Sequence, residues 1–277
     1  MNKEDQNQTA ALRRKIFLTA LRGGQAHLAS SFSCLEILYA LYVRGVLRLE
    51  PGKTDDPDRD RLILSKGHAG LAMYACMNAA GVIPEDAMTR YLQPDGDLGG
   101  EPVTGTLPGI EAATGSLGHG LSIGVGMAMA GRMDQRDYTV YVILGDGECQ
   151  EGTIWEAAVS ACRYSLGNLT VILDSNRIQK MGFVDDAMGR ADWKAKWQAF
   201  GWRTEEIADG HDVDEIVQVL TMLKQDPDPR PRLVIANTVK GKGVSLMENS
   251  ADWHFRMPRR KELKVFLKEL GISEDEV

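Results

Sequence analysis

The stretch Thr139-Val-Tyr-Val-Ile-Leu-Gly-Asp-Gly-Glu148 joins an unbroken run of β-branched, aromatic and aliphatic residues to an aspartate between two glycines. A second apolar run, Leu169–Leu173, ends at Asp174-Ser175-Asn176, and a third, Arg232–Ala236, ends at Asn237-Thr238. Continuous apolar runs of this length are typical of strands buried on both faces, as in a parallel sheet. The three runs therefore predict neighbouring parallel strands with polar residues at their carboxyl ends.

Segments with helical spacing separate these strands. Ile154–Tyr164 lies between the first two, and Asp192–Phe200 and Val213–Leu223 precede the third. The alternation predicts an α/β fold with an open, mostly parallel sheet and helices on both faces. We expect residues 1–277 to form a single domain that ends in a short helix, Pro258–Leu270.

The first hundred residues are predicted to be mostly helical. Ala10–Leu21 and Cys34–Val43 carry apolar residues at helical spacing, and the glycine-containing break Gly23–His27 between them places a histidine on a loop. Gly67–Gly81 is predicted to be a further helix. The stretch Pro94–Gly109 is rich in Gly and Pro and is predicted to be a loop, and loops of this length are often functional.

Composition narrows the class of protein. The net charge of −7 argues against nucleic-acid binding, because polyanions need a basic face. No apolar run approaches the roughly 18 residues that a membrane helix needs, and the polar first residues do not resemble a signal peptide. The four cysteines form no CxxC pair, which favours reduced thiols and argues against a zinc site. We expect a cytoplasmic protein.

Asp146 and Asn176 follow two successive predicted strands, separated by one strand–helix–strand unit. Because ligands of open parallel sheets bind beyond the carboxyl ends of the strands, both side chains should meet at one edge. A carboxylate and an amide oxygen suit Mg²⁺ or Ca²⁺. Gly145 and Gly147 would let the backbone approach a diphosphate and donate N–H groups to it. A plain turn is the alternative for Gly-Asp-Gly alone.

This pattern, Gly-Asp-Gly followed one βαβ unit later by Asn, is the thiamine-diphosphate motif, and the sequence as a whole resembles the transketolase family. The resemblance extends over nearly all 277 residues in family order. It is carried by the segments GQAHLASSFSCLEIL, ILSKGHAGLAMYA, GIEAATGSLGHGLSIGVGMA, LGDGECQEGTIWEAA, NRIQ and ANTVKGKGVSLMENSADWH.

The resemblance implies a role for individual residues. It implies that Mg²⁺ or Ca²⁺ is held by Asp146, Asn176 and the backbone carbonyl of Ile178. It implies that thiamine diphosphate is contacted by Ser30, His68, Gly115, Ser116, Leu117, Gly147, Asn176, Lys240 and His254. It implies that His27 and His254 face the substrate as catalytic residues. His211, in contrast, is predicted to be a helix-entry residue.

Two departures from the family pattern affect the expected function. Family members usually carry Gly-His-Pro where this chain has Gly100-Glu101-Pro102, so the donor substrate or the activity is expected to differ. The family's pyrimidine-binding domain has no counterpart in this sequence. The resemblance therefore implies a partner, a C-terminal transketolase subunit that carries that domain, in an α2β2 assembly.

The implied reaction is transfer of a two-carbon ketol unit from a ketose, or its phosphate, to an aldose. One alternative is a subunit of another thiamine-diphosphate enzyme, either related to 2-oxo acid dehydrogenases or acting on an unusual ketol donor. A second alternative is a degenerate subunit that binds without catalysing. The segments GSLGHG and TVKGKG favour the transketolase interpretation, and the absence of a GxGxxG after any predicted strand disfavours a dinucleotide-binding fold.

Overall fold

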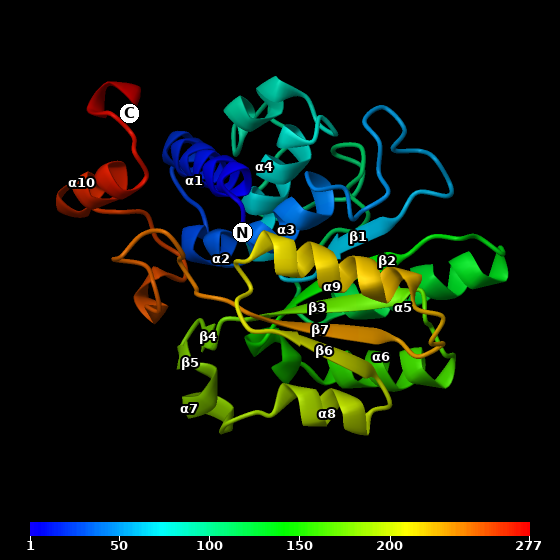
Figure 1. Cartoon of the computed structure of the whole chain (residues 1–277). Coiled ribbons are helices and arrows are strands. Elements are labelled where there is room, and N and C mark those ends of the chain that lie inside the picture. The colour runs from blue at the N-terminus through cyan, green and yellow to red at the C-terminus, as the bar shows by residue number, and fades with distance from the viewer.

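A five-stranded parallel sheet forms the centre of the protein (Figure 1). The computed structural model describes all 277 residues, Met1–Val277. The strand order is β1-β2-β3-β7-β6. The strands of this sheet are β1 (Arg61–Leu64), β2 (Val140–Gly145), β3 (Leu169–Ser175), β6 (Arg203–Ile207) and β7 (Arg232–Asn237). The predicted α/β class with a mostly parallel sheet is confirmed.

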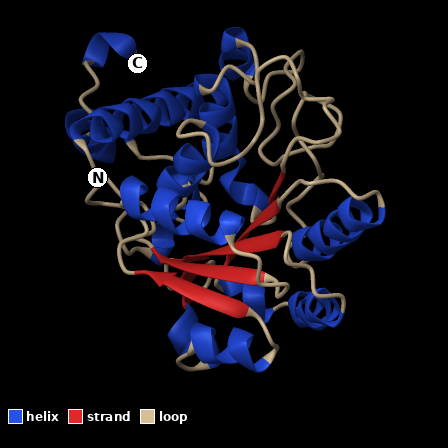
Figure 2. Cartoon of the chain, turned by 45° about the vertical axis from the view of Figure 1, so that its right-hand side comes forward, coloured by secondary structure: helices blue, strands red, loops and turns tan.

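Helices cover both faces of the sheet (Figure 2). The buried core on one face is built with α1 (Lys3–Gly23), α2 (Leu28–Ser33), α3 (Leu35–Tyr42), α4 (Gly70–Ala79), α9 (Val213–Gln225) and α10 (Arg260–Glu269). The core on the other face is built with α5 (His119–Met133), α6 (Gly152–Arg163) and α8 (Trp193–Ala199). No helix is long and apolar enough to serve as a membrane span.

Alternate side chains of the central strands pack into the two cores on opposite faces of the sheet. In β2, Tyr141 and Ile143 pack into the first core, whereas Val140, Val142 and Leu144 pack into the second. Successive side chains of a strand point to opposite faces, so a strand covered by helices on both faces must be apolar throughout. This is the physical reason for the unbroken apolar run in the sequence.

Smaller elements lie near the carboxyl ends of the strands. A two-stranded antiparallel hairpin, β4 (Ile178–Gln179) and β5 (Gly182–Phe183), follows β3 and leads into the short helix α7 (Val184–Met188). The predicted loop Pro94–Gly109 contains no helix or strand. Short 3₁₀ helices occupy Gly67–Ala69, Glu85–Arg90, Gly147–Gln150, Ala251–Trp253 and Glu274–Glu276.

Candidate cofactor site

Four neighbouring strands end at one edge of the sheet and deliver polar residues there. Gly145 at the end of β2 is in register with Asp174 of β3, so Asp146 and Asn176 follow adjacent strand ends, as predicted. Lys66 follows β1, and Lys240 follows β7. Residues that are far apart in the sequence therefore converge on one site because parallel strands share a carboxyl edge.

A cavity of about 290 Å³ lies at this edge. It is lined by Ser30, Lys66, His68, Leu117, Gly145, Asp146, Gly147, Glu148, Asn176, Ile178, Gln179, Lys180, Met181, Lys240 and His254. Nine of the residues implied by the family resemblance are in this set: Ser30, His68, Leu117, Asp146, Gly147, Asn176, Ile178, Lys240 and His254. The structure thus gathers these residues around one space.

The three implied metal ligands offer only oxygen atoms, which is the donor chemistry that Mg²⁺ and Ca²⁺ prefer. Asp146 is 2% exposed, and burial, followed by the neighbouring Asp174, raises its pKa to about 6. A buried carboxylate whose charge is this poorly compensated fits a site for a bound cation. No group of three His, Cys, Asp or Glu side chains suited to a metal occurs anywhere in the chain, so this ligand set depends on one carboxylate, one amide and one carbonyl oxygen.

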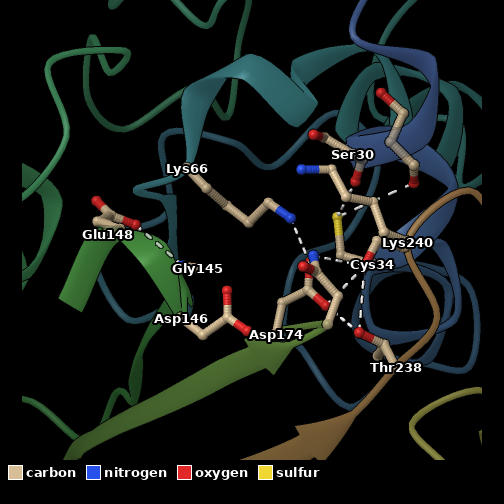
Figure 3. A network of polar contacts seen from close by, with 12 residues as sticks. Ser30, Cys34, Lys66, Gly145, Asp146, Glu148, Asp174, Thr238 and Lys240 are labelled. Atoms are coloured by element: carbon tan, nitrogen blue, oxygen red, sulfur yellow. Dashed lines mark hydrogen bonds and ion pairs between the residues drawn. The ribbon is translucent and has the colours of Figure 1, made fainter. Parts of the chain in front are cut away.

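The Asn176 amide is held in one orientation by a buried network. Its Nδ2 donates to the Ser33 hydroxyl at 3.1 Å and to an Asp174 carboxylate oxygen at 3.3 Å. Asp174 also pairs with the Lys66 ammonium and accepts from Thr238 (Figure 3). Because Nδ2 donates to these two acceptors, Oδ1 is the amide atom available to a metal. Oδ1 already accepts the Ile178 N–H at 3.0 Å, and its second lone pair would serve as the metal ligand.

Lys66 and Asp174 form a buried ion pair at the site. Burial alone would raise the pKa of Asp174, but the Lys66 ammonium outweighs burial and lowers it. Burial would likewise lower the pKa of Lys66, and Asp174 raises it instead. The pair is therefore ionised on both sides and cancels its own charge, whereas the two other acidic side chains of the cavity, Asp146 and Glu148, have no ion-pair partner.

Lys240 and Gly147 both line the cavity. The Lys240 ammonium lies 2.9 Å from the Ile178 carbonyl oxygen and 3.1 Å from His254 Nδ1. Burial, with a contribution from Lys66, lowers the pKa of Lys240 to about 8. A side chain at Gly147 would collide with Gln179, whose Cβ lies 2.9 Å from the position of an added Cβ. The backbone can approach a ligand closely only because this position is glycine.

Three histidines from distant segments form a triangle at the mouth of the cavity. The ring centroids of His27, His68 and His254 are separated by 5.3 to 5.4 Å. Burial, then Lys240, lowers the pKa of His27 to about 4 and that of His254 to about 3. Burial also lowers the pKa of His68 well below its ordinary value. All three imidazoles are therefore neutral at pH 7 and can each donate and accept a hydrogen bond.

This clustering predicts a measurable pH effect. In NMR titrations, the ring protons of His27 and His254 should show no protonation step between pH 5 and pH 8. The unfolded chain takes up these protons near its ordinary pKa of about 6.5, so the free energy of unfolding should fall as the pH drops from about 6.5 to about 4. His27→Asn should flatten part of that slope. A step near pH 6.5 for either ring in the folded protein would contradict the prediction.

Three implied residues do not line the cavity. His27 contacts it only through the histidine triangle. Ser116 is exposed, and its hydroxyl lies 3.3 Å from His119 Nδ1. Gly115 has a φ of +125°, and the Glu101 carboxylate occupies the space that a side chain at this position would need. Glu101 therefore lies beside the segment Gly115–Leu117, at the rim of the site.

Five lining residues were not predicted from the sequence: Lys66, Glu148, Gln179, Lys180 and Met181. Lys66 follows β1, a strand of four residues that was not predicted. Glu148 is buried and accepts hydrogen bonds from Ser65 at 2.5 Å, from the Gly118 N–H at 2.9 Å and from the Gly145 N–H at 3.1 Å. It thereby joins the start of α5 to the end of β2. The sequence signal that could have identified Glu148 is its position, directly after the Gly-Asp-Gly at the end of a predicted strand.

Comparison with known proteins decides the family. Residues 8–277 match the family described as transketolase, thiamine diphosphate binding domain. The chain belongs to the transketolase family. The predicted family and enzyme class, a thiamine-diphosphate-dependent transferase of the transketolase type, are confirmed.

Relatives in the transketolase family include separate subunits of similar length. One subunit of the apulose-4-phosphate transketolase of Actinobacillus succinogenes is 40% identical over 268 residues, which are 96% of each chain. The 6-deoxy-6-sulfo-D-fructose transketolase subunit SqwG of a Clostridium species is 38% identical over 249 residues, 90% of each chain. The chain is thus similar over its length to transketolase subunits.

Among solved structures, transketolase from Campylobacter jejuni superposes with a TM-score of 0.88 at 28% identity, over 99% of this chain and 44% of that one. The chain therefore spans less than half the length of that transketolase. The part of the family that the chain matches is the thiamine diphosphate binding domain.

Proposed function

We propose that this chain, residues 1–277 acting as one domain, is the diphosphate- and metal-binding subunit of a two-subunit transketolase. The enzyme would transfer a two-carbon ketol unit from a ketose, or its phosphate, to an aldose or its phosphate. The partner would be a C-terminal transketolase subunit with the pyrimidine-binding domain, in a cytoplasmic α2β2 assembly. The subunit designations of the relatives support a partner of this kind.

One observation carries the proposal. Oxygen donors, a buried lysine and two neutral histidines, His68 and His254, line a single cavity at the carboxyl edge of the sheet, and His27 packs against both histidines. Asp146, Asn176 and the Ile178 carbonyl would hold Mg²⁺ or Ca²⁺. The diphosphate and adjoining parts of the cofactor would be contacted by Ser30, His68, Gly115, Ser116, Leu117, Gly147, Asn176, Lys240 and His254.

The chain's own groups would position substrate and move protons. Thiamine diphosphate supplies an electron sink for the carbanion formed when a ketose is cleaved. His27 and His254 would donate and accept protons at substrate oxygens, and proton transfer by a positioned histidine typically contributes about 10²–10⁴-fold in rate. Their lowered pKa values keep both imidazoles in the neutral form that can do either.

The proposal is tested by binding and by turnover. The chain is titrated with thiamine diphosphate in the presence and absence of Mg²⁺, and the chain copurified with its coexpressed partner is screened against ketose donors. The donor panel should include apulose 4-phosphate and 6-deoxy-6-sulfofructose, because relatives carry those names. Metal-dependent cofactor binding together with ketol transfer supports the proposal, and turnover of a 2-oxo acid in place of a ketose would replace it with the alternative enzyme class.

The rim residue Glu101 is expected to influence donor choice. Its carboxylate lies against Gly115, beside the segment proposed to line the cofactor. An ionised carboxylate only accepts hydrogen bonds, whereas the imidazole usual in the family can also donate. Glu101→His should therefore shift the ratio of kcat/KM values for a common ketose phosphate and the chain's own donor by about tenfold, the effect of one hydrogen bond.

Glu101→Gln is the matched control for this substitution because it removes the charge without adding an imidazole. A change seen equally in both variants would assign the effect to the lost charge. If neither variant alters the ratio, Glu101 does not face the donor.

A further inference from the structure

His211 is buried and bridges two parts of the protein that are distant in sequence. Its Nδ1 lies 2.8 Å from Glu36 Oε2, and its Nε2 accepts the Val239 backbone N–H at 2.8 Å. Because Nε2 must carry a lone pair to accept that bond, Nδ1 carries the proton and donates to Glu36. The prediction of a helix-entry residue describes its place before α9 but not these contacts.

Glu36 is shared with a second buried side chain. Arg13 Nη2 of α1 lies 2.6 Å from Glu36 Oε1, and Arg13 Nε donates to the Lys242 carbonyl at 2.9 Å. Burial alone would raise the pKa of Glu36, but Arg13 and His211 outweigh it and lower that pKa. The carboxylate of Glu36 is thus ionised and fixes both neighbours at once.

Arg13 and His211 both contact the segment Val239–Gly243, which carries Lys240. His211 accepts from the backbone immediately before Lys240, and Arg13 donates to the backbone two residues after it. Gly241 and Gly243 have φ values of +81° and +93°, and the segment forms turns, not a helix or strand, with the Lys242 N–H bonded to the Val239 carbonyl. Contacts with other parts of the protein, which also include the Gly241 N–H to the Ala29 carbonyl at 3.0 Å, help to fix where the Lys240 side chain enters the cavity.

We propose that Glu36, Arg13 and His211 form a buried clamp that positions Lys240 for the diphosphate. The proposal rests on the proposed function for the role of Lys240, but the clamp itself is independent of it. None of the three residues lines the cavity, so each would be a positioning residue that acts through the backbone of Val239–Gly243. Polar groups that orient a ligand-binding residue typically affect ligand affinity about 10- to 100-fold.

The decisive variants are His211→Phe and His211→Gln. Phenylalanine fills the space but cannot accept the Val239 N–H, whereas glutamine offers an oxygen to Val239 and an amide N–H to Glu36. Without cofactor, hydrogen exchange in the peptide containing Val239–Gly243 should accelerate in His211→Phe and be restored in His211→Gln. Affinity for thiamine diphosphate with Mg²⁺ should fall about tenfold or more in the first and recover in the second.

Lys224→Met is a matched control for loss of stability. It removes a different, partly buried interaction, the Lys224 ammonium 2.6 Å from Asp60 Oδ2, at the amino end of the sheet. If this variant loses as much stability as His211→Phe but keeps wild-type exchange in Val239–Gly243 and wild-type affinity, a general loss of stability is excluded as the cause.

Unchanged exchange in Val239–Gly243 in His211→Phe would overturn the clamp. Accelerated exchange with unchanged cofactor affinity would show that the clamp does not position Lys240 for the diphosphate, and would also overturn the proposal. Failure of the wild-type chain to bind thiamine diphosphate would refute the proposed function, while the exchange result would still test the clamp. If His211→Phe does not fold, Glu36→Gln replaces it, because loss of the charge that holds Arg13 and His211 should accelerate the same exchange.

Discussion

The isolated chain is expected to show no ketol transfer, and activity should appear when a chain with the pyrimidine-binding domain is added. The cavity holds groups suited to the diphosphate and metal, but large apolar side chains at its mouth are uncovered. Met181 lines the cavity and is 87% exposed, and Phe255 packs against His27 while 52% exposed. A cofactor anchored at one end would have its reactive carbon poorly placed, and a displacement of about 1 Å can cost around 10²-fold in rate.

Coupled assays on each chain alone and on the mixture, with size-exclusion chromatography, would measure this effect. Met181→Ser tests whether the uncovered surface meets the partner, and Met133→Ser is its control because Met133 is also exposed, at 79%, but lies on α5 outside the cavity. Full activity from this chain, with no other protein copurifying, would disprove dependence on a partner.

Asp146→Asn should nearly abolish metal-dependent binding of thiamine diphosphate while the domain still folds. The carboxylate is the only anion among the three proposed metal ligands, and its amide replacement keeps the size and the acceptor for the Gly147 N–H. Changes in groups outside the first coordination sphere cost about 10–100-fold in metal affinity, and the loss of a direct anionic ligand should exceed that. The other carboxylate oxygen accepts the Arg177 N–H, and the amide leaves that donor without its partner, so the free energy of unfolding should fall by no more than about 1–3 kcal/mol.

Calorimetric titration with thiamine diphosphate and Mg²⁺, alongside thermal unfolding, would check this prediction. Asp185→Asn is the matched control, since Asp185 lies on the same side of the sheet, pairs with Arg177 and does not line the cavity. Wild-type affinity in Asp146→Asn would place the metal elsewhere.

The central strands were predictable because helices cover both of their faces. Burial on both sides forces every residue of β2 and most of β3 and β7 to be apolar, and such a run is visible in the sequence. The edge strand β6 has the sequence Arg-Thr-Glu-Glu-Ile, and part of it is exposed. Because it is mostly polar, it has no apolar run by which a strand could be recognised. Strand β1 is only four residues long, too short for its periodicity to be distinguished.

Some parts of the site could be predicted from the sequence, and others could not. Asp146 and Asn176 follow recognisable strands, and strand adjacency places them together without knowledge of any side-chain contact. His211 stands in a local sequence typical of a turn, whereas its partner Glu36 is 175 positions away. A hydrogen bond over that separation leaves no local pattern, so only the folded structure reveals it.

The convergence of four strand ends has a consequence for folding. Lys66, Asp146, Asn176 and Lys240 meet only after β1, β2, β3 and β7 have all paired, and pairings between distant parallel strands form slowly because long loops must close first. No partly folded form of the chain can hold the complete cavity. A ligand that binds only the native state raises its stability by RT ln(1 + [L]/Kd), so cofactor supply should control how much of the newly made chain persists against proteolysis.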